Sequence, residues 1–135
     1  MIRAMRIIIA GSVPFEDVSI LTDAEQEALG MVNYFEDAQI VIKCKDGLFT
    51  IPTYKISLIE LKKARKITNP SIVEKVVRLA IGNTTFGPAY IVKPGRLSDA
   101  GLPLIFEPLD QFTFIADGIA HITTDFNVTL MQNRK

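Results

Sequence analysis

Short apolar runs separated by turn-forming residues recur along the chain, and their spacing changes from strand-like to helix-like and back. A block rich in β-branched residues, Met5 to Ile9, ends at Gly11 and predicts a strand over residues 3–10. Thr22 and Glu25 form a capping box, which predicts a helix over residues 23–36. Its expected buried stripe consists of Ala24, Ala28, Leu29, Val32 and Phe35.

Two Asp-Gly pairs predict β-hairpins. Asp46-Gly47 separates the apolar segments 40–45 and 48–54, and Asp117-Gly118 separates the segments 112–116 and 119–124. Asp-Gly readily supplies the positive φ angles of a tight turn, so each pair of segments is expected to form two adjacent antiparallel strands.

The middle of the chain carries two further capping boxes. Ser57 with Glu60 predicts a helix over residues 57–66, although Tyr54, Ile56 and Leu58 also permit a continuing strand. Ser71 with Glu74 predicts a largely buried helix over residues 71–81.

Glycine and proline become frequent after Asn83, which favours strands and turns over helices. We expect a strand over residues 86–92, a long loop over 93–103 and a last strand over 127–131. The polar residues 132–135 are expected to be frayed.

This order of elements predicts an α+β fold. Residues 3–92 match the βαββαβ order of a split βαβ, or ferredoxin-like, sandwich, followed by a β-rich C-terminal extension. We therefore expect one α+β domain over residues 1–135, in which residues 93–135 form a β-hairpin-rich segment.

The composition is that of a globular protein, with 48% hydrophobic and 22% charged residues in a chain of 135. The single cysteine, Cys44, cannot form an internal disulfide, which fits a reducing compartment such as the cytoplasm. No apolar run approaches the ~20 residues of a membrane-spanning helix, so no membrane is expected among the partners.

Fifteen basic and fifteen acidic residues cancel, so any attraction to an anionic partner must come from a local patch. The densest such patch consists of Lys62, Lys63, Arg65 and Lys66. Acidic residues gather instead at Asp23, Glu25, Glu27, Glu36 and Asp37. This segregation predicts either head-to-tail association between copies or two helices that neutralise each other side by side.

Two features are candidates for sites of chemistry. His121, the only histidine, shares a strand face with Asp117 and Asp125, but this spacing is too wide for one metal ion, so we expect a surface or hydrogen-bonded side chain. Gly11 and Ser12 at a strand end could admit phosphate to backbone amides, but the rest of a phosphate-binding pattern is missing. We assign no catalytic, cofactor-binding or metal-binding residue and expect no cofactor.

The function expected from the sequence is that of a non-enzymatic structural or assembly subunit. It would be oligomeric, through self-association or a partner protein, and part of a larger particle such as a virion, a tail or a cytoplasmic complex. One alternative is a small enzyme or nucleotide-binding protein that uses Gly11 and Ser12 or His121. Another is a nucleic-acid-binding module, in which helices at 57–66 and 71–81 form a helix-turn-helix and residues 62–66 contact phosphates.

Overall fold

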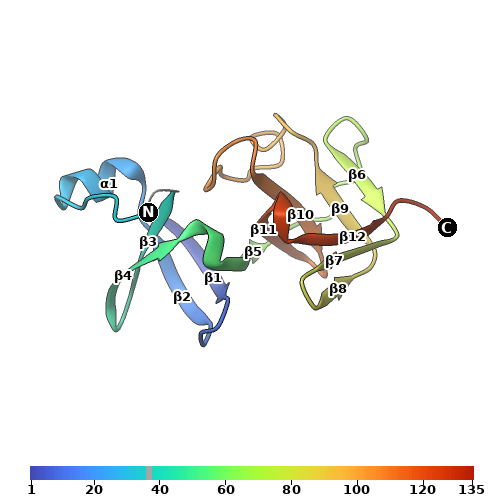
Figure 1. Cartoon of the computed structure of the whole chain (residues 1–135). Helices are drawn as coiled ribbons and strands as arrows, with labels where there is room; N and C mark the ends of the chain where they lie inside the picture. Colours follow the sequence, from blue (N-terminus) through green and yellow to red (C-terminus); the bar gives the residue numbers. More distant parts are fainter. Residues whose placement is uncertain (36–37) are drawn as a thin grey trace.

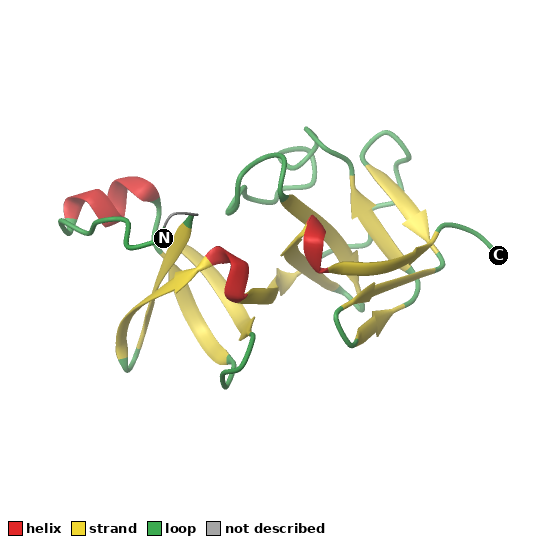
Figure 2. Cartoon of the chain, in the orientation of Figure 1, coloured by secondary structure: helices red, strands yellow, loops and turns green. Residues whose placement is uncertain are grey.

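The computed structural model describes residues 1–35 and 38–135, and in these residues the chain is almost entirely β-sheet (Figures 1 and 2). The strands are β1 (Ile2–Ile9), β2 (Phe15–Ile20), β3 (Gln39–Cys44), β4 (Gly47–Pro52), β5 (Ile56–Lys63), β6 (Val73–Val76), β7 (Arg78–Ile81), β8 (Thr84–Phe86), β9 (Ala89–Val92), β10 (Gln111–Ala116), β11 (Ile119–Thr124) and β12 (Val128–Gln132). The helical elements are α1 (Asp23–Ala28) and two 3-10 turns, Thr53–Lys55 and Asp125–Asn127.

Nine strands form one sheet in the order β4-β3-β2-β1-β5-β11-β10-β9-β6, and β12, β7 and β8 form a second sheet. All of the strand pairs are antiparallel. Figure 1 shows β1–β4 on one side, β6–β12 on the other and β5 running between them. The central strand β5 therefore joins the two halves of the molecule, because it pairs with β1 and with β11.

Two apolar clusters fill the interior. The larger one is formed mainly by strands of the nine-stranded sheet and includes Ile7, Ile59 and Ile122 from its three central strands. The segment after β9 covers part of this face, since Leu102 and Phe106 belong to the same cluster. The smaller cluster lies between the two sheets and includes Leu79 of β7, Phe86 of β8 and Phe114 of β10.

The α+β, ferredoxin-like expectation is wrong. The two short helices predicted over residues 57–66 and 71–81, which together would form the second crossover, are strands, so there is no split βαβ unit in the described residues. The run at 57–66 is strand β5, which is buried on both faces, and such a strand loses the period-2 alternation that distinguishes it from a helix. The run at 71–81 is divided between two short strands, β6 and β7, so its helix-like spacing arises from two separate elements.

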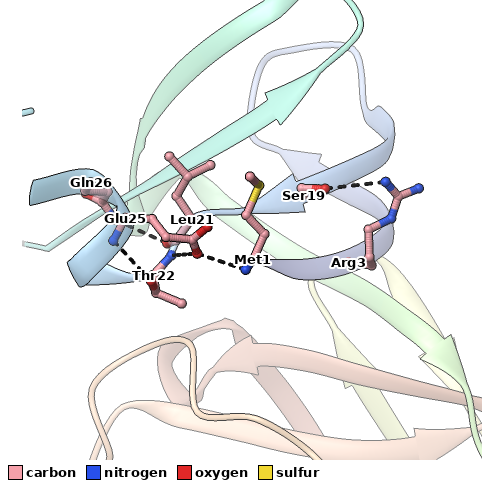
Figure 3. Close-up of polar contacts among 7 residues, drawn as sticks. All are labelled: Met1, Arg3, Ser19, Leu21, Thr22, Glu25 and Gln26. Atoms are coloured by element: carbon pink, nitrogen blue, oxygen red, sulfur yellow. Dashed lines mark hydrogen bonds and ion pairs between the residues drawn. The ribbon is translucent and has the colours of Figure 1, made fainter. Parts of the chain in front are cut away.

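The helix predicted over residues 23–36 is much shorter. Thr22 and Glu25 do form the capping box, with both of its reciprocal hydrogen bonds (Figure 3). The helix ends at Ala28 because Gly30, at φ +70°, terminates it: its N–H donates to Glu27, and the Met31 N–H donates to Gln26. No helical residue is buried, Leu29 and Val32 are exposed, and Glu36 lies outside the described residues.

The helix predicted over residues 57–66 is instead strand β5, as the alternative interpretation allowed. Ile56, Leu58, Ile59 and Leu61 are all buried, so side chains on both faces of the strand are covered. A strand in the middle of a nine-stranded sheet gains two rows of backbone hydrogen bonds, and this outweighs a four-residue capping pattern.

The helix predicted over residues 71–81 is replaced by β6 and β7. Asn69 Oδ1 accepts the Ser71 N–H at 3.0 Å, a local turn that takes the place of the expected helix cap. The strand breaks at Val77, whose N–H donates to the Gln132 carbonyl of β12 at 2.8 Å. Val77 is thus the corner at which the chain passes from the large sheet to the small one.

Both predicted hairpins form, as β3–β4 and β10–β11. The turn of the second is Asp117-Gly118 as predicted, whereas the turn of the first is Lys45-Asp46, because Gly47 already pairs with Cys44 as the first residue of β4. The first strand and the last are confirmed too, as β1 and β12. The predicted strand 86–92 is two strands, β8 and β9, and the long loop after it extends to Asp110. The hydrophobic pattern gave no prediction for β2. None of the described residues lies in a helix long and apolar enough to cross a membrane.

Candidate interaction surfaces

The large sheet splits open next to its centre. The ladder between β1 and β5 runs from Ile9 to Arg6, which pairs with Glu60. Towards the N-terminal end of β1 this ladder ends: β1 remains paired with β2, whereas β5 remains paired with β11. In the ladder between β5 and β11, Ala120 pairs with Lys62 and His121 pairs with Glu60. Leu61 is therefore an extra residue in β5 that has no partner in β11. Such a bulge bends the strand that carries the extra residue, which accounts for the separation of the two strands.

The split forms a groove of about 620 Å³, called here the basic groove. Its walls are Ile2–Met5 of β1 and Leu61–Lys63 of β5, and Asp17 and Pro103 complete the lining. Ala4 and Leu61 are buried and form an apolar floor. Arg3, Lys62 and Lys63 supply three positive charges against the single carboxylate of Asp17.

The predicted basic patch lies at this groove and just beyond it. Lys62 and Lys63 end β5, and Arg65 and Lys66 follow in the connection to β6. All four side chains are exposed. Lys62 Nζ donates to the Gly101 carbonyl at 3.1 Å, and Lys66 Nζ lies 5.5 Å from the ring centre of Tyr90. The helix-turn-helix considered for this patch does not form, because both of its helices are strands.

Figure 3 shows the third cation of the groove, Arg3, whose Nη1 donates to Ser19 Oγ at 3.4 Å. It also shows the hydrogen-bonded ion pair between the amino group of Met1 and the Glu25 carboxylate. The nitrogen lies 2.9 Å from Glu25 Oε1. This hydrogen bond, together with the cap at Thr22, lowers the pKa of Glu25. The Glu25 carboxylate therefore already binds groups close to it, whereas the only side-chain partner of Arg3 among the described residues is the Ser19 hydroxyl group.

A tight turn at Glu107–Asp110 projects an apolar side chain between two carboxylates. The Asp110 and Gln111 N–H groups donate to the Glu107 carbonyl at 2.9 and 3.0 Å, which closes the turn. Leu109 at its tip is 92% exposed. Sequence reasoning overlooked this turn, although Glu-Pro-Leu-Asp has proline at the second position, where β-turns favour it.

The turn lies within a wider surface that combines exposed apolar and acidic side chains. Next to it are hollows of about 320 and 640 Å³, lined among others by Tyr54 and Phe126 in one and by Leu104 in the other. These three side chains are about half exposed or more. A third hollow of about 560 Å³ brings Glu107 near α1. The acidic residues along this surface are Asp23, Glu27, Glu107, Asp110 and Asp125.

The structure excludes one of the two interpretations of the segregated charge. The ion pairs among the described residues are Met1–Glu25, Arg6–Glu60 and Arg96–Asp99. None of these joins the basic patch to α1, and the patch is not on a helix, so the side-by-side neutralisation is wrong. Two of the acidic residues, Glu36 and Asp37, lie outside the described residues.

Gly11 and Ser12 lie in the exposed turn between β1 and β2. Gly11 has φ +73°, and the Ser12 N–H donates to the Ile9 carbonyl at 3.3 Å. The element that follows is a strand, whereas the phosphate sites of nucleotide-binding folds use the N-terminus of a helix.

His121 lies on the predicted hairpin arm, β11, but it is buried rather than at the surface. Its imidazole stacks on Phe114, with ring centres 4.7 Å apart and planes within 6°. The ring of Phe86, from the small sheet, packs 4.8 Å away. Its Nδ1 has no hydrogen-bond partner, and Asp117 and Asp125 are exposed at the two ends of the strand.

Burial lowers the pKa of His121 below its ordinary value of 6.5. The negative charges of Glu60, which pairs with His121 from the neighbouring strand β5, and of Asp117 raise this pKa, but their effects are weaker than that of burial. Glu60 also accepts a 2.7 Å hydrogen bond from Arg6 Nη2. His121 is therefore neutral at pH 7, and its contacts are those of a residue that packs the two sheets together.

Within residues 1–35 and 38–135, no group of three or more His, Cys, Asp or Glu side chains is placed to hold a metal ion. Comparisons with models of protein families, with curated proteins and with solved structures gave no match.

Proposed function

We propose that the chain is a non-enzymatic assembly subunit that associates with further copies of itself as part of a larger particle. The observation that carries this proposal is Leu109, 92% exposed on a closed turn and flanked by the carboxylates of Glu107 and Asp110. Together with the exposed Tyr54, Leu104 and Phe126 beside the turn, Leu109 forms an exposed apolar surface, and such surfaces with polar rims mark protein–protein interaction sites.

The energetics of this surface favour association. Burying one leucine side chain stabilises a contact by about 1.5–3 kcal/mol. Tyr54, Leu104 and Phe126 are exposed around the same turn, so a partner that covers it removes further apolar area from water. The turn is already fixed by two backbone hydrogen bonds, so binding costs little additional conformational entropy.

A second copy is the partner whose charge fits. The apolar surface carries acidic residues, and at the basic groove Arg3, Lys62 and Lys63 have no ion pair among the described residues. Oppositely charged surfaces on one chain attract each other between copies although the net charge is zero. The neutral imidazole of His121, enclosed by Phe114 and Phe86, fits packing better than acid-base work.

The experiment is the mass of the protein in solution, measured by light scattering over a series of concentrations. We expect a mass above the 15.0 kDa of one chain, which rises with concentration and falls when salt is raised from about 0.15 M to about 1 M. A mass of one chain at every concentration and at low salt would contradict self-association.

A further inference from the structure

We infer that the turn Glu107–Asp110 of one copy docks in the basic groove of the next copy. Leu109 would lie against the apolar floor, and the two carboxylates would lie among the groove's cations. This contact rests on the proposed self-association and names the two surfaces that meet in it.

The groove offers the apolar half of this contact. Ala4 and Leu61 form its buried floor, and the partly exposed Ile2 and Met5 line it beside them. Its volume of about 620 Å³ leaves room for more than one leucine side chain. Met5 is flexible and can adapt its shape to the incoming side chain.

The groove also offers the ionic half. Arg3, Lys62 and Lys63 stand around the floor, and none of them has a carboxylate within ion-pair distance among the described residues. Lys62 uses one of its three N–H donors on Gly101 and keeps two. Two incoming carboxylates would thus meet three cations and the single negative charge of Asp17.

A protein turn fits this groove better than nucleic acid does. No aromatic residue lines the groove, whereas proteins that hold single strands stack bases on aromatic rings. The buried apolar floor has no counterpart in a phosphate backbone, but it matches the leucine of the turn.

The contact is heterologous, because each copy contributes its turn to one neighbour and its groove to another. Such contacts propagate into rings or filaments. They also allow complementation: a copy with a defective turn and a copy with a defective groove still share one intact contact. Their mixture can form a pair but nothing larger.

The experiment uses two variants of the full chain. Leu109→Ser removes the exposed apolar side chain, and Lys62→Glu with Lys63→Glu reverses the groove's charge. All three side chains are exposed, so we expect the fold to be retained, with only the Lys62–Gly101 hydrogen bond lost. We expect each variant to raise the dissociation constant of self-association by at least about tenfold. We expect the two together to form a 1:1 pair of twice 15.0 kDa.

A charge exchange and a control complete the test. Adding Glu107→Lys and Asp110→Lys to the groove variant should restore association, because the ionic contacts reform with opposite signs. Arg134→Glu with Lys135→Glu is the matched control, since it reverses two exposed cations at the chain end and should leave the mass unchanged.

The outcomes separate this contact from the proposed function. If the unaltered protein associates and both variants associate equally well, the docking contact is overturned and self-association stands. If the unaltered protein is a monomer throughout, both are overturned. A monomer that binds a single-stranded oligonucleotide through Lys62 and Lys63 would also overturn both and would identify a nucleic-acid-binding groove.

Discussion

The imidazole of His121 lies parallel to the ring of Phe114, its direct partner across the β10–β11 hairpin, with the ring centres 4.7 Å apart. Phe86 of β8 contacts both rings, at 4.8 Å from His121 and 5.1 Å from Phe114. The three rings therefore tie the small sheet to the large one, and the histidine acts in this cluster as an aromatic residue.

Replacing this histidine should cost stability. His121→Gln removes two ring contacts and places an amide in an apolar site, so we expect the free energy of unfolding to fall by about 1–3 kcal/mol in urea denaturation. A loss within about 0.5 kcal/mol, the usual range for surface positions, would show that the ring cluster contributes little.

The same variant should change how stability depends on pH. The folded-state pKa of His121 lies below 6.5, so the unfolded chain binds more protons between that pKa and 6.5. The stability contributed by the neutral imidazole is complete above pH 6.5 and is lost as the pH falls towards the folded-state pKa. His121→Gln should lack this slope.

Glu60→Gln provides the matching control for the pH effect. It removes the charge that opposes the effect of burial, so the pKa of His121 should fall further in an NMR titration, and the slope should extend to lower pH. Arg6, which pairs with Glu60, and Asp117, at the end of β11, remain as the other charges near the imidazole. An unchanged pKa would contradict the assigned electrostatic coupling.

The sequence predicted local features correctly where a few neighbouring residues decide the conformation. The Thr22 capping box and the two Asp-Gly hairpins are of this kind. The capping patterns at Ser57 and Ser71 failed because pairing with distant strands outweighed them: β5 bonds to β1 and β11, and β6 bonds to β9. Local patterns cannot reveal such partners.

The two candidate interaction surfaces were predicted only in part. The charge of Lys62 and Lys63 was visible in the sequence, but the groove was not. It exists because β5 skips Leu61 where it pairs with Ala120 and His121, about sixty residues further along the chain. The turn at Leu109 did have a local signal in Pro108, but its exposure depends on the loop's packing through Leu102 and Phe106.

The turn between β10 and β11 gives a test of backbone conformation. Asp117 has φ +54° and Gly118 φ +73°, the pair of positive angles that defines a type I′ hairpin turn. Gly118→Val should therefore lower the free energy of unfolding by more than about 1 kcal/mol. Asp117→Gly should change it by less than about 0.5 kcal/mol, since glycine adopts this angle without strain. Equal melting temperatures for Gly118→Val and the unaltered protein would contradict the turn.

Gly47, at φ +128°, gives a second backbone test in the other hairpin. It pairs with Cys44 at the start of β4, and side chains rarely adopt this angle. Gly47→Val should also cost more than about 1 kcal/mol in thermal or urea unfolding. Asp46→Asn keeps the turn's shape and should leave stability within about 0.5 kcal/mol, so a loss as large as that of Gly47→Val would argue against a backbone cause.

Gly87 tests the corner that joins the two sheets. A Cβ atom on Gly87 would lie 2.8 Å from the carbonyl oxygen of Val77, closer than packed atoms approach. Val77 cannot retreat easily, because its N–H donates to Gln132 and the strands on either side of it belong to different sheets. We expect Gly87→Ala to destabilise the fold by about 1–3 kcal/mol, the usual cost of forcing an extra group into a packed site.

Gly95→Ala is the control that separates this steric clash from the backbone strain caused by replacing a glycine. Gly95 has φ +79° and open space around its Cα, so alanine there meets backbone strain but no clash, with a cost of about 1 kcal/mol. Amide hydrogen exchange should distinguish the two: Gly87→Ala should speed exchange at Val77 and in β12, whereas Gly95→Ala should leave those amides protected. If both variants leave Val77 equally protected, the close contact at the corner does not govern the packing of the small sheet.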